Sequence, residues 1–132
     1  MTDVYSLNLI TLVGHIASDI ESGNSKKGAL FVRFQLATNE LFFKRGGEGK
    51  PTKNVEFHPI VGWGKMAGQI KKWGSKGKSI IVIGKLRHKD MKQADGTSRI
   101  NSFVEIQSFT WQGKKKDFEE ESVDEEENTD PI

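Results

Sequence analysis

The chain has 132 residues, a length that suits one domain with its own core. It contains no cysteine, which excludes a disulfide framework, a thiolate metal site and a thiol nucleophile. Glycine is frequent, at 14 residues, and this favours a strand-rich domain with many turns over a helical bundle. The sequence shows neither an apolar run long enough to cross a membrane nor a leader pattern at its start, so we expect a cytoplasmic protein.

The formal net charge of +2 conceals two parts of opposite sign. Residues 1–113 carry 17 Lys and Arg against 9 Asp and Glu, a net charge of +8. Residues 114–132 carry three Lys and 9 acidic residues, a net charge of −6. Such asymmetry is typical of a nucleic-acid-binding body with an acidic tail, although solvated surface is the plain alternative. Because periodicity ends near Gly113, we expect one domain over residues 1–112 and a disordered acidic tail over residues 113–132.

The first half of the chain predicts two strands and two connections. Residues 5–16 are rich in β-branched and apolar side chains, and Gly14 indicates a bulge or bend within this strand. Residues 17–28 are polar and are expected to form a loop. Residues 29–38 alternate apolar and polar side chains, which predicts a half-buried strand. Residues 39–53 are basic and rich in glycine, and they are expected to form a long arm between strands.

The second half of the chain predicts three more strands and one helix. Residues 54–63 and 78–89 have the pattern of a third and a fourth strand. Between them, residues 65–73 place apolar side chains at i, i+4 and i+7, which is typical of a short amphipathic helix. An Asp-Gly pair then indicates a hairpin turn before a fifth strand over residues 99–111. This order matches a five-stranded OB-fold barrel with a helix between strands 3 and 4, and on order alone a split sandwich stays open.

Two aromatic rings on the third strand bear on function. Phe57 and Trp63 are six residues apart, and this even spacing places both rings on one face of the strand, roughly 20 Å apart. The pattern alone does not decide whether that face is core or surface. Pro59 lacks the N–H that a central strand donates, so we expect the strand to be bulged or to lie at an edge there.

Signatures of an enzyme are weak. His15, His58 and His88 lack the spacing of metal ligands, so we expect no metal site. For Glu40 and Glu56, solvated or ion-paired glutamates are a better interpretation than a catalytic carboxylate pair. The Gly-Lys pair that follows the third strand lacks the rest of a phosphate-binding loop. We therefore expect a binding protein with no catalytic residue, no metal and no cofactor.

Signatures of single-stranded nucleic acid binding are stronger, because aromatic rings and cations occur together. Phe42 precedes Lys44 and Arg45, and Trp73 follows two lysines. For Trp73, on the apolar face of the helix, packing in the core is the favoured interpretation. Core or interface positions are likewise expected for the aromatic residues of the last strand, Phe103, Phe109 and Trp111, and a core position for one of Phe31 and Phe34.

Several segments resemble the bacterial and phage single-stranded DNA-binding protein family in order and spacing. The segments are LNLITLVGHIASDIE (7–21), FQLATNE (34–40), EFHPIVGWGKMA (56–67), GKSIIVIGKLR (77–87) and DGTSR (95–99). The likeness covers residues 4–111. It implies an OB fold that wraps single-stranded DNA without sequence preference, in replication, recombination and repair. It also implies a homo-oligomer, with a tetramer favoured and a dimer as the alternative, and a nucleoid-associated location.

The resemblance further implies roles for single residues. The stacking rings of the family map onto Phe42, Phe57 and Trp63. A fourth stacking position falls on Met91, whose polarizable thioether can touch a base but has no π-surface. His58 matches a histidine associated with subunit contacts, and a structural role is compatible with that.

The tail resembles the acidic C-terminus through which this family recruits replication and repair proteins. Its tip is Asp130, Pro131 and Ile132, which keeps the acid and the proline of the family but not its terminal Phe. A solubilising tail is the alternative.

We therefore expect a non-enzymatic protein that coats and protects single-stranded DNA by aromatic stacking and phosphate contacts. An RNA-binding OB-fold protein and a protein–protein adaptor are the alternatives. The candidates for phosphate contact are basic residues of the arm, the helix and the fourth strand: Lys44, Arg45, Lys50, Lys53, Lys65, Lys71, Lys72, Arg87 and Lys89.

Overall fold

The structure of the protein, a computed structural model, describes residues 5–43 and 49–113. In chain order the described part forms β1 (Ile10–Ile16), β2 (Glu21–Asn24), β3 (Leu30–Phe42), β4 (Thr52–Trp63), α1 (Gly64–Trp73), β5 (Ser79–Lys92) and β6 (Ser98–Trp111).

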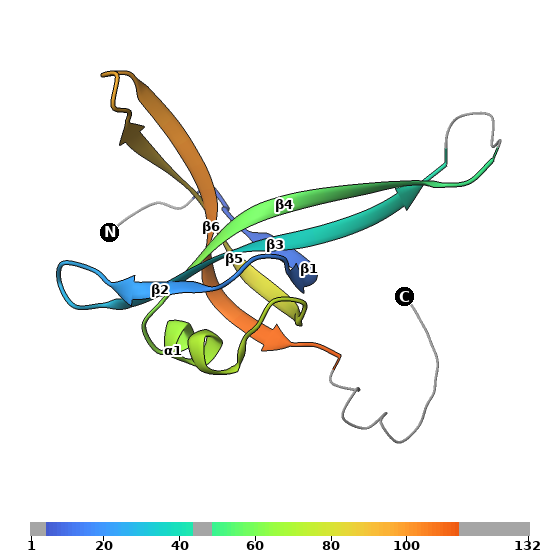
Figure 1. Ribbon diagram of the computed structural model, residues 1–132, viewed down its shortest axis with the longest axis horizontal. Helices are drawn as coiled ribbons and strands as arrows, with labels where there is room; N and C mark the ends of the chain where they lie inside the picture. The colour runs from blue at the N-terminus through green and yellow to red at the C-terminus, as the bar shows by residue number, and fades with distance from the viewer. Residues whose placement is uncertain (1–4, 44–48, 114–132) are drawn as a thin grey trace.

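Five of these strands close into a barrel (Figure 1). Neighbouring strands follow the order β1-β5-β6-β4-β3-β2, and the ring closes because β1 also pairs with β3. The contact between β4 and β6 is parallel, whereas the other pairs are antiparallel. The helix connects β4 to β5 and lies at one end of the barrel. The predicted five-stranded OB-fold barrel, with its helix between the third and fourth barrel strands, is confirmed.

Alternation along the strands builds the core. Val32, Phe34 and Leu36 of β3 are buried, and so are Ile80 and Val82 of β5. The helix covers the end of this core with Ala67 and Ile70, which are fully buried. Within the described residues, no helix is long and apolar enough to span a membrane.

The segment predicted as a loop over residues 17–28 contains a short strand. β2 pairs antiparallel with β3 from Glu21 opposite Arg33 to Asn24 opposite Leu30. The loop prediction was wrong here because β2 is polar and short, and among the described strands it pairs only with the outer edge of β3. A pattern without apolar alternation gives no sign of a strand that forms by edge pairing. β2 does not enter the closed ring, so the barrel keeps five strands.

Two hairpins extend well beyond the barrel (Figure 1). β3 and β4 stay paired as far as Phe42 opposite Thr52, so the two ends of the predicted arm, residues 39–42 and 52–53, belong to a two-stranded ribbon. β5 and β6 likewise stay paired as far as Lys92 opposite Ser98. The predicted strands were too short at these ends, because both faces of a projecting ribbon are exposed and need no alternation of apolar and polar residues.

Pro59 lies at an edge and not in a bulge. The β3–β4 register runs without interruption through Gln35 opposite Pro59. The backbone N–H and C=O of Gln35 point away from β4 and need no partner on Pro59. The N–H donates to Ser18 Oγ, and the C=O accepts from the Ala17 N–H. On its far side β4 meets β6 only at Ile60 and Val61, so the missing N–H of Pro59 faces an unpaired stretch.

Gly14 is required by close packing. No bulge interrupts the β1–β5 register at Gly14, contrary to the first of the two predictions for this residue. Its α-carbon instead faces the Ala37 carbonyl of β3, and a β-carbon there would lie 2.1 Å from that oxygen. The next two residues, His15 and Ile16, pair with β3. A side chain at Gly14 would therefore push apart the seam that closes the barrel.

The predicted hairpin turn at Asp95 is confirmed. Gly96 has a φ of 91°, and the Gln93 N–H donates to the Thr97 carbonyl at 2.7 Å. Asp95 Oδ1 accepts hydrogen bonds from the Thr97 N–H at 3.0 Å and from Thr97 Oγ1 at 2.7 Å. The bond from the Thr97 backbone N–H has the largest effect, followed by the bond from the Thr97 hydroxyl. Both stabilise the ionised carboxylate and so lower the pKa of Asp95 from its usual value.

Trp73 is exposed, which contradicts the prediction that it packs in the core. The side chain is 58% exposed, whereas Ile70 on the same helix is fully buried. Trp73 is the last residue of α1, so it lies beyond the part of the helix that covers the barrel. Periodicity places a residue on a face of a helix but does not say how far along the helix the core extends.

Candidate nucleic-acid interface

The rings of Phe57 and Trp63 lie on the outer face of β4. Phe57 is 59% exposed and Trp63 is 39% exposed. Ile60, of the opposite parity, is fully buried. The alternation of side chains therefore turns both rings away from the core, as one face of the strand requires. The question that the sequence left open is answered, because this face of β4 is surface.

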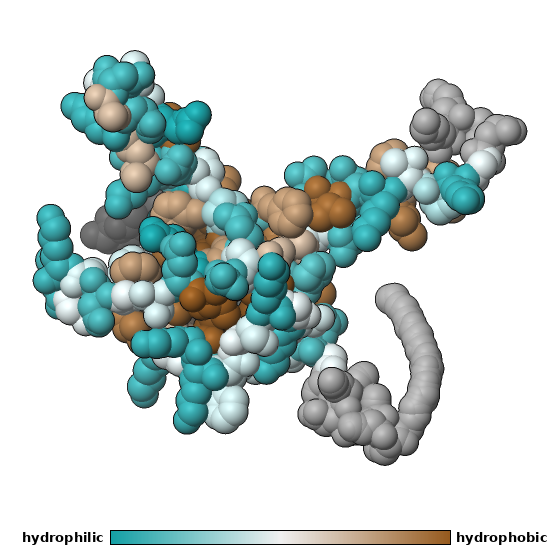
Figure 2. Space-filling view, viewed as in Figure 1, coloured by the Kyte–Doolittle hydropathy of each residue, from teal (hydrophilic) through white to brown (hydrophobic). Residues whose placement is uncertain are grey.

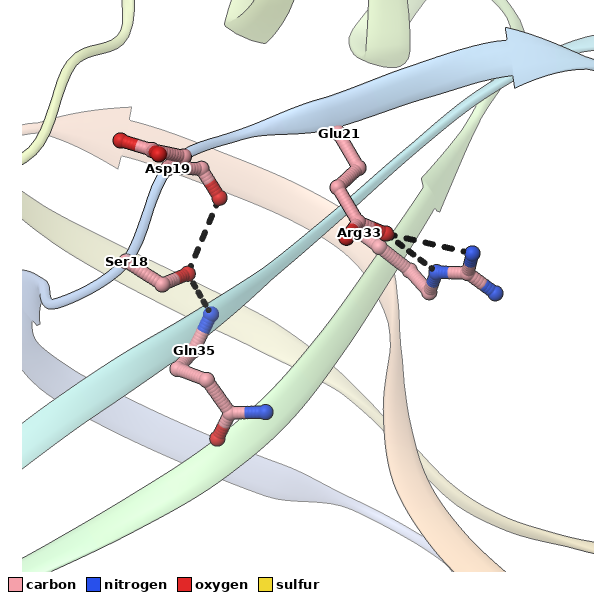
Figure 3. Close-up of polar contacts among 5 residues, drawn as sticks. All are labelled: Ser18, Asp19, Glu21, Arg33 and Gln35. Carbon is pink, nitrogen blue, oxygen red and sulfur yellow. Dashed lines mark hydrogen bonds and ion pairs between the residues drawn. The ribbon is translucent and has the colours of Figure 1, made fainter.

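A small cluster of side chains supports Trp63. Phe31 lies opposite it on β3, with ring centroids 5.6 Å apart and planes tilted by 57°. The guanidinium of Arg33 lies 5.4 Å from the centre of the Phe31 ring. Arg33 also pairs with Glu21 Oε1 of β2 at 3.2 Å (Figure 3). Both side chains of this ion pair are largely exposed, 58% for Arg33 and 68% for Glu21, so the pair restrains the guanidinium only weakly.

The segment before β2 is fastened to β3 beside this cluster (Figure 3). Ser18 Oγ accepts a hydrogen bond from the Gln35 N–H at 2.9 Å and donates one to the Asp19 carbonyl at 3.0 Å. This contact fixes the start of β2, and hence the position of Glu21 beside Arg33.

The same outer face continues from β4 across β6 to β5. Val61 of β4 lies beside Glu105 of β6, and Glu105 lies opposite Lys85 of β5. Arg87 and Lys89 have the same parity as Lys85, so they share this outer face. Arg87 is held by Glu105, with Nε 2.7 Å from Oε1.

Met91 lies on the same face, farther along the β5–β6 hairpin. It is 39% exposed and stands opposite Arg99. The predicted fourth stacking position, Met91, therefore lies across from Arg99 near the tip of the β5–β6 hairpin, away from the barrel.

Phe42 differs from the other two predicted rings. It is 47% exposed, at the end of β3, and its even position gives it the parity of the buried Phe34 and Leu36. By alternation it lies on the face of the β3–β4 ribbon opposite Phe57. Figure 2 shows hydrophobic side chains among hydrophilic ones along this ribbon.

The face that Phe42 shares is acidic. Glu40 and Glu56 come close together there, because the side-chain amide of Asn54 lies 3.5 Å from Glu40 Oε1 and 3.3 Å from Glu56 Oε2. All three side chains are exposed or half-buried, in keeping with the interpretation of solvated glutamates. Within the described ranges no three His, Asp or Glu side chains gather as metal ligands would.

The predicted phosphate-contacting residues fall into three groups. Lys53, Arg87 and Lys89 lie on the outer face that carries Phe57 and Trp63. Lys65 lies two residues after Trp63, in the first turn of α1, and Lys71 and Lys72 lie in its last turn. Lys50 is exposed just before β4, whereas Lys44 and Arg45 lie outside the described residues, as does the predicted tip of Asp130, Pro131 and Ile132.

His58 makes a structural contact within the described chain. The half-buried ring lies opposite Leu36, with Nε2 2.9 Å from Thr38 Oγ1. A satisfied hydrogen bond within the barrel accounts for this histidine in one copy of the chain. The predicted subunit contact stays a prediction.

Sequence reasoning missed Phe31, Arg33 and Glu105 as parts of this face. The sequence did contain a signal for the outward position of Phe31 and Arg33, because both alternate with the buried Val32 and Phe34. The position of Glu105 had no such signal, since its neighbour Val61 comes from a parallel strand far away in sequence.

The fold and this face together define an OB-fold protein with exposed aromatic rings and cations on one outer surface of its barrel. The sequence model of the single-strand binding protein family matches residues 7–112. The chain therefore belongs to the single-strand binding protein family, as its sequence motifs indicated, and the interpretation as a binding protein without enzymatic activity is confirmed by this membership.

Individual proteins that are similar to this chain belong to the same family by name. The chain is 35% identical over 81 residues to single-stranded DNA-binding protein 1 of Chlorobaculum tepidum, a match that covers 61% of this chain and 49% of that relative. It is 30% identical over 109 residues to single-stranded DNA-binding protein 3 of Clostridium acetobutylicum, covering 80% and 72% of the two chains. The Plasmodium falciparum SSB in its complex with ssDNA has the same fold, with a TM-score of 0.73 over 84% of this chain and 99% of that one, at 21% identity.

Proposed function

We propose that this protein binds and coats single-stranded DNA without sequence preference, and so serves replication, recombination and repair. The observation that carries the proposal is the pair of exposed rings, Phe57 and Trp63, on an outer barrel face bordered by Lys53, Arg87 and Lys89. The names of the relatives and the family match support it.

The proposed mechanism has two parts. Separated bases stack on Phe57 and Trp63, which contributes about 1–3 kcal/mol per base and does not depend on sequence because every base has a π-face. Cations along the same face follow the phosphates and release condensed counterions, so affinity falls as salt rises. Arg87 contacts Glu105 through Nε, and the remaining N–H groups of its guanidinium can contact a phosphate while that pair is kept.

Oligo-dT and tryptophan fluorescence test the proposal. Bases that stack on Trp63 are expected to quench its emission, and the affinity is expected to fall linearly on a log–log plot against salt. An adaptor that binds only proteins would show neither effect. Competition with RNA of equal length separates the third candidate, since an RNA-binding protein would prefer the RNA.

Assembly into a homo-oligomer, a tetramer rather than a dimer, is part of the proposal. β1 and β5 carry an apolar outer strip in which Val13, 50% exposed, lies opposite Ile81, and Thr11 lies opposite Ile83. Leu9, just before β1, is also exposed. An apolar strip on the wall of a barrel is suited to burial against a second copy. Mass measurement in solution, with and without oligo-dT, determines the number of copies.

We also propose that the tip of Asp130, Pro131 and Ile132 recruits replication and repair proteins, and that the protein is cytoplasmic and associated with the nucleoid. The acid and the proline at the tip support recruitment. Retention of partner enzymes by the full chain, and not by a chain that ends at residue 129, tests it.

A further inference from the structure

A second aromatic site lies at the helix end of the barrel, outside the face described above. A hollow of about 520 Å³ is lined by Gln69, Trp73, Lys78, Phe109, Thr110 and Trp111. Its two tryptophans come from the last turn of α1 and the last residue of β6. Phe109 and Trp111 meet edge to face, with ring centroids 5.2 Å apart.

Cations accompany both tryptophans of the hollow. Lys72 Nζ lies 5.0 Å from the centre of the Trp73 ring. Lys78 Nζ lies 4.4 Å from the centre of the Trp111 ring and donates a hydrogen bond to the Trp73 carbonyl at 2.9 Å. Lys78 therefore contacts both tryptophans, through the ring of Trp111 and the backbone carbonyl of Trp73. None of the six lining residues is acidic. The hollow therefore combines ring faces and positive charge, which is the pair of features that a nucleotide requires.

The exposed side of α1 connects the hollow with Trp63. Lys65, Gln69 and Lys72 are exposed and stand at i, i+4 and i+7, so they form one row along the helix. The row begins two residues after Trp63 and ends at the hollow, over a helix about 15 Å long. The helix contains no acidic residue to repel a polyanion along this row.

We propose that the track of single-stranded DNA continues from Trp63 along Lys65, Gln69 and Lys72 into the hollow, where a base stacks on Trp73. This inference rests on the proposed function. Continuity with the β4 face favours DNA over an acidic peptide as the occupant, because a strand already bound at Trp63 reaches the hollow by extension. A peptide would have to bind there alone.

Affinity as a function of oligonucleotide length tests the proposal in the full-length protein. The probe is labelled oligo-dT, in steps from about 4 to about 16 nucleotides, the range of site sizes of an OB fold. Trp73→Ala is expected to leave the affinity for the shortest bound oligonucleotide unchanged and to weaken the longest about fivefold or more. Trp73→Phe, the matched control, keeps a ring and most of the affinity.

Fluorescence gives an independent measurement. Trp63→Phe keeps a stacking ring on β4 and leaves Trp73 and Trp111 as the only tryptophans of the chain. Quenching of this variant by long oligonucleotides, and not by short ones, supports the second site. Constant emission while labelled long oligo-dT binds overturns it and leaves the proposed function intact.

Other outcomes also decide. If the wild type fails to bind oligo-dT of any length, the proposed function fails. If the wild type binds and Trp73→Ala binds equally at every length, only the second site is overturned. A rise in affinity at every length would show that Trp73 contacts the acidic tail, and an altered mass would show that it contacts another copy of the chain. Either result overturns the second site.

Discussion

The two faces of the β3–β4 arm carry opposite chemistry, although one alternating backbone produces both. Phe57 and Val55 stand on the outer face with Lys53. On the other face, Asn54 lies between the carboxylates of Glu40 and Glu56. Along this ribbon, each step of one residue therefore exchanges an aromatic or cationic surface for an acidic one.

This difference shows how a thin ribbon can select one side for a polyanion. On our proposal, DNA stacks and makes phosphate contacts on the outer face, and the two glutamates repel phosphates from the other face. Phe42 has an exposed ring on the acidic side, and its predicted stacking role stays a prediction.

Exchanging the residues at positions 56 and 57 is expected to have the largest effect on DNA affinity. The double variant Glu56→Phe with Phe57→Glu moves the ring to the acidic face and places a carboxylate among the cations. Affinity for oligo-dT is expected to fall by more than tenfold and by more than for Phe57→Ala, because repulsion is added to lost stacking. Since both residues are exposed, circular dichroism should be unchanged. Affinity within threefold of wild type would contradict the assignment of faces.

Removal of the outer ring alone is expected to come next. Phe57→Ala should weaken binding about tenfold, within the range that the loss of one stacked base gives. Phe57 is exposed and lies opposite Ala37, so thermal unfolding should change little. Equal affinity in wild type and variant, measured by anisotropy at fixed salt, would remove this ring from the site.

Removal of the ring on the acidic face should matter less. Phe42→Ala is expected to weaken binding less than about threefold, because alternation turns Phe42 away from Phe57. Anisotropy measured beside Phe57→Ala gives the comparison directly. A loss as large as that of Phe57→Ala would mean that DNA reaches both faces of the ribbon.

The smallest effect is expected from the acidic face itself. Glu40→Gln with Glu56→Gln removes two charges and retains hydrogen-bonding groups beside Asn54. Affinity should rise by about twofold at low salt, and the gain should vanish near 1 M salt, where the Debye length is about 3 Å. A gain that persists at high salt would show that these carboxylates do more than repel phosphates.

Much of the fold followed from local patterns. Alternation indicated a half-buried strand at β3, and the Asp-Gly pair indicated the turn at Asp95. The same reasoning missed β2, because its pairing with the edge of β3 is a contact between strands and leaves no period in a four-residue segment.

The sequence likewise predicted some positions of the candidate site and not others. Parity placed Phe57 and Trp63 together, and the structure confirms that they share an exposed face. Parity was not applied to Phe42, whose opposite face follows from the uninterrupted β3–β4 register. Trp73 was assigned to the core because helical periodicity does not show where the barrel ends.

The sequence by itself determined which residues share a face, since that depends only on the two-residue period of a strand and the 3.6-residue period of a helix. It also determined the family, through motifs that agree in order. Only the tertiary structure decided which faces are exposed, because burial depends on strands distant in the chain. Closure of β1 on β3 and of β4 on β6 buried Ile60 and left Trp63 outside. The end of the barrel then left Trp73 exposed beside Lys78, where no local pattern could place it.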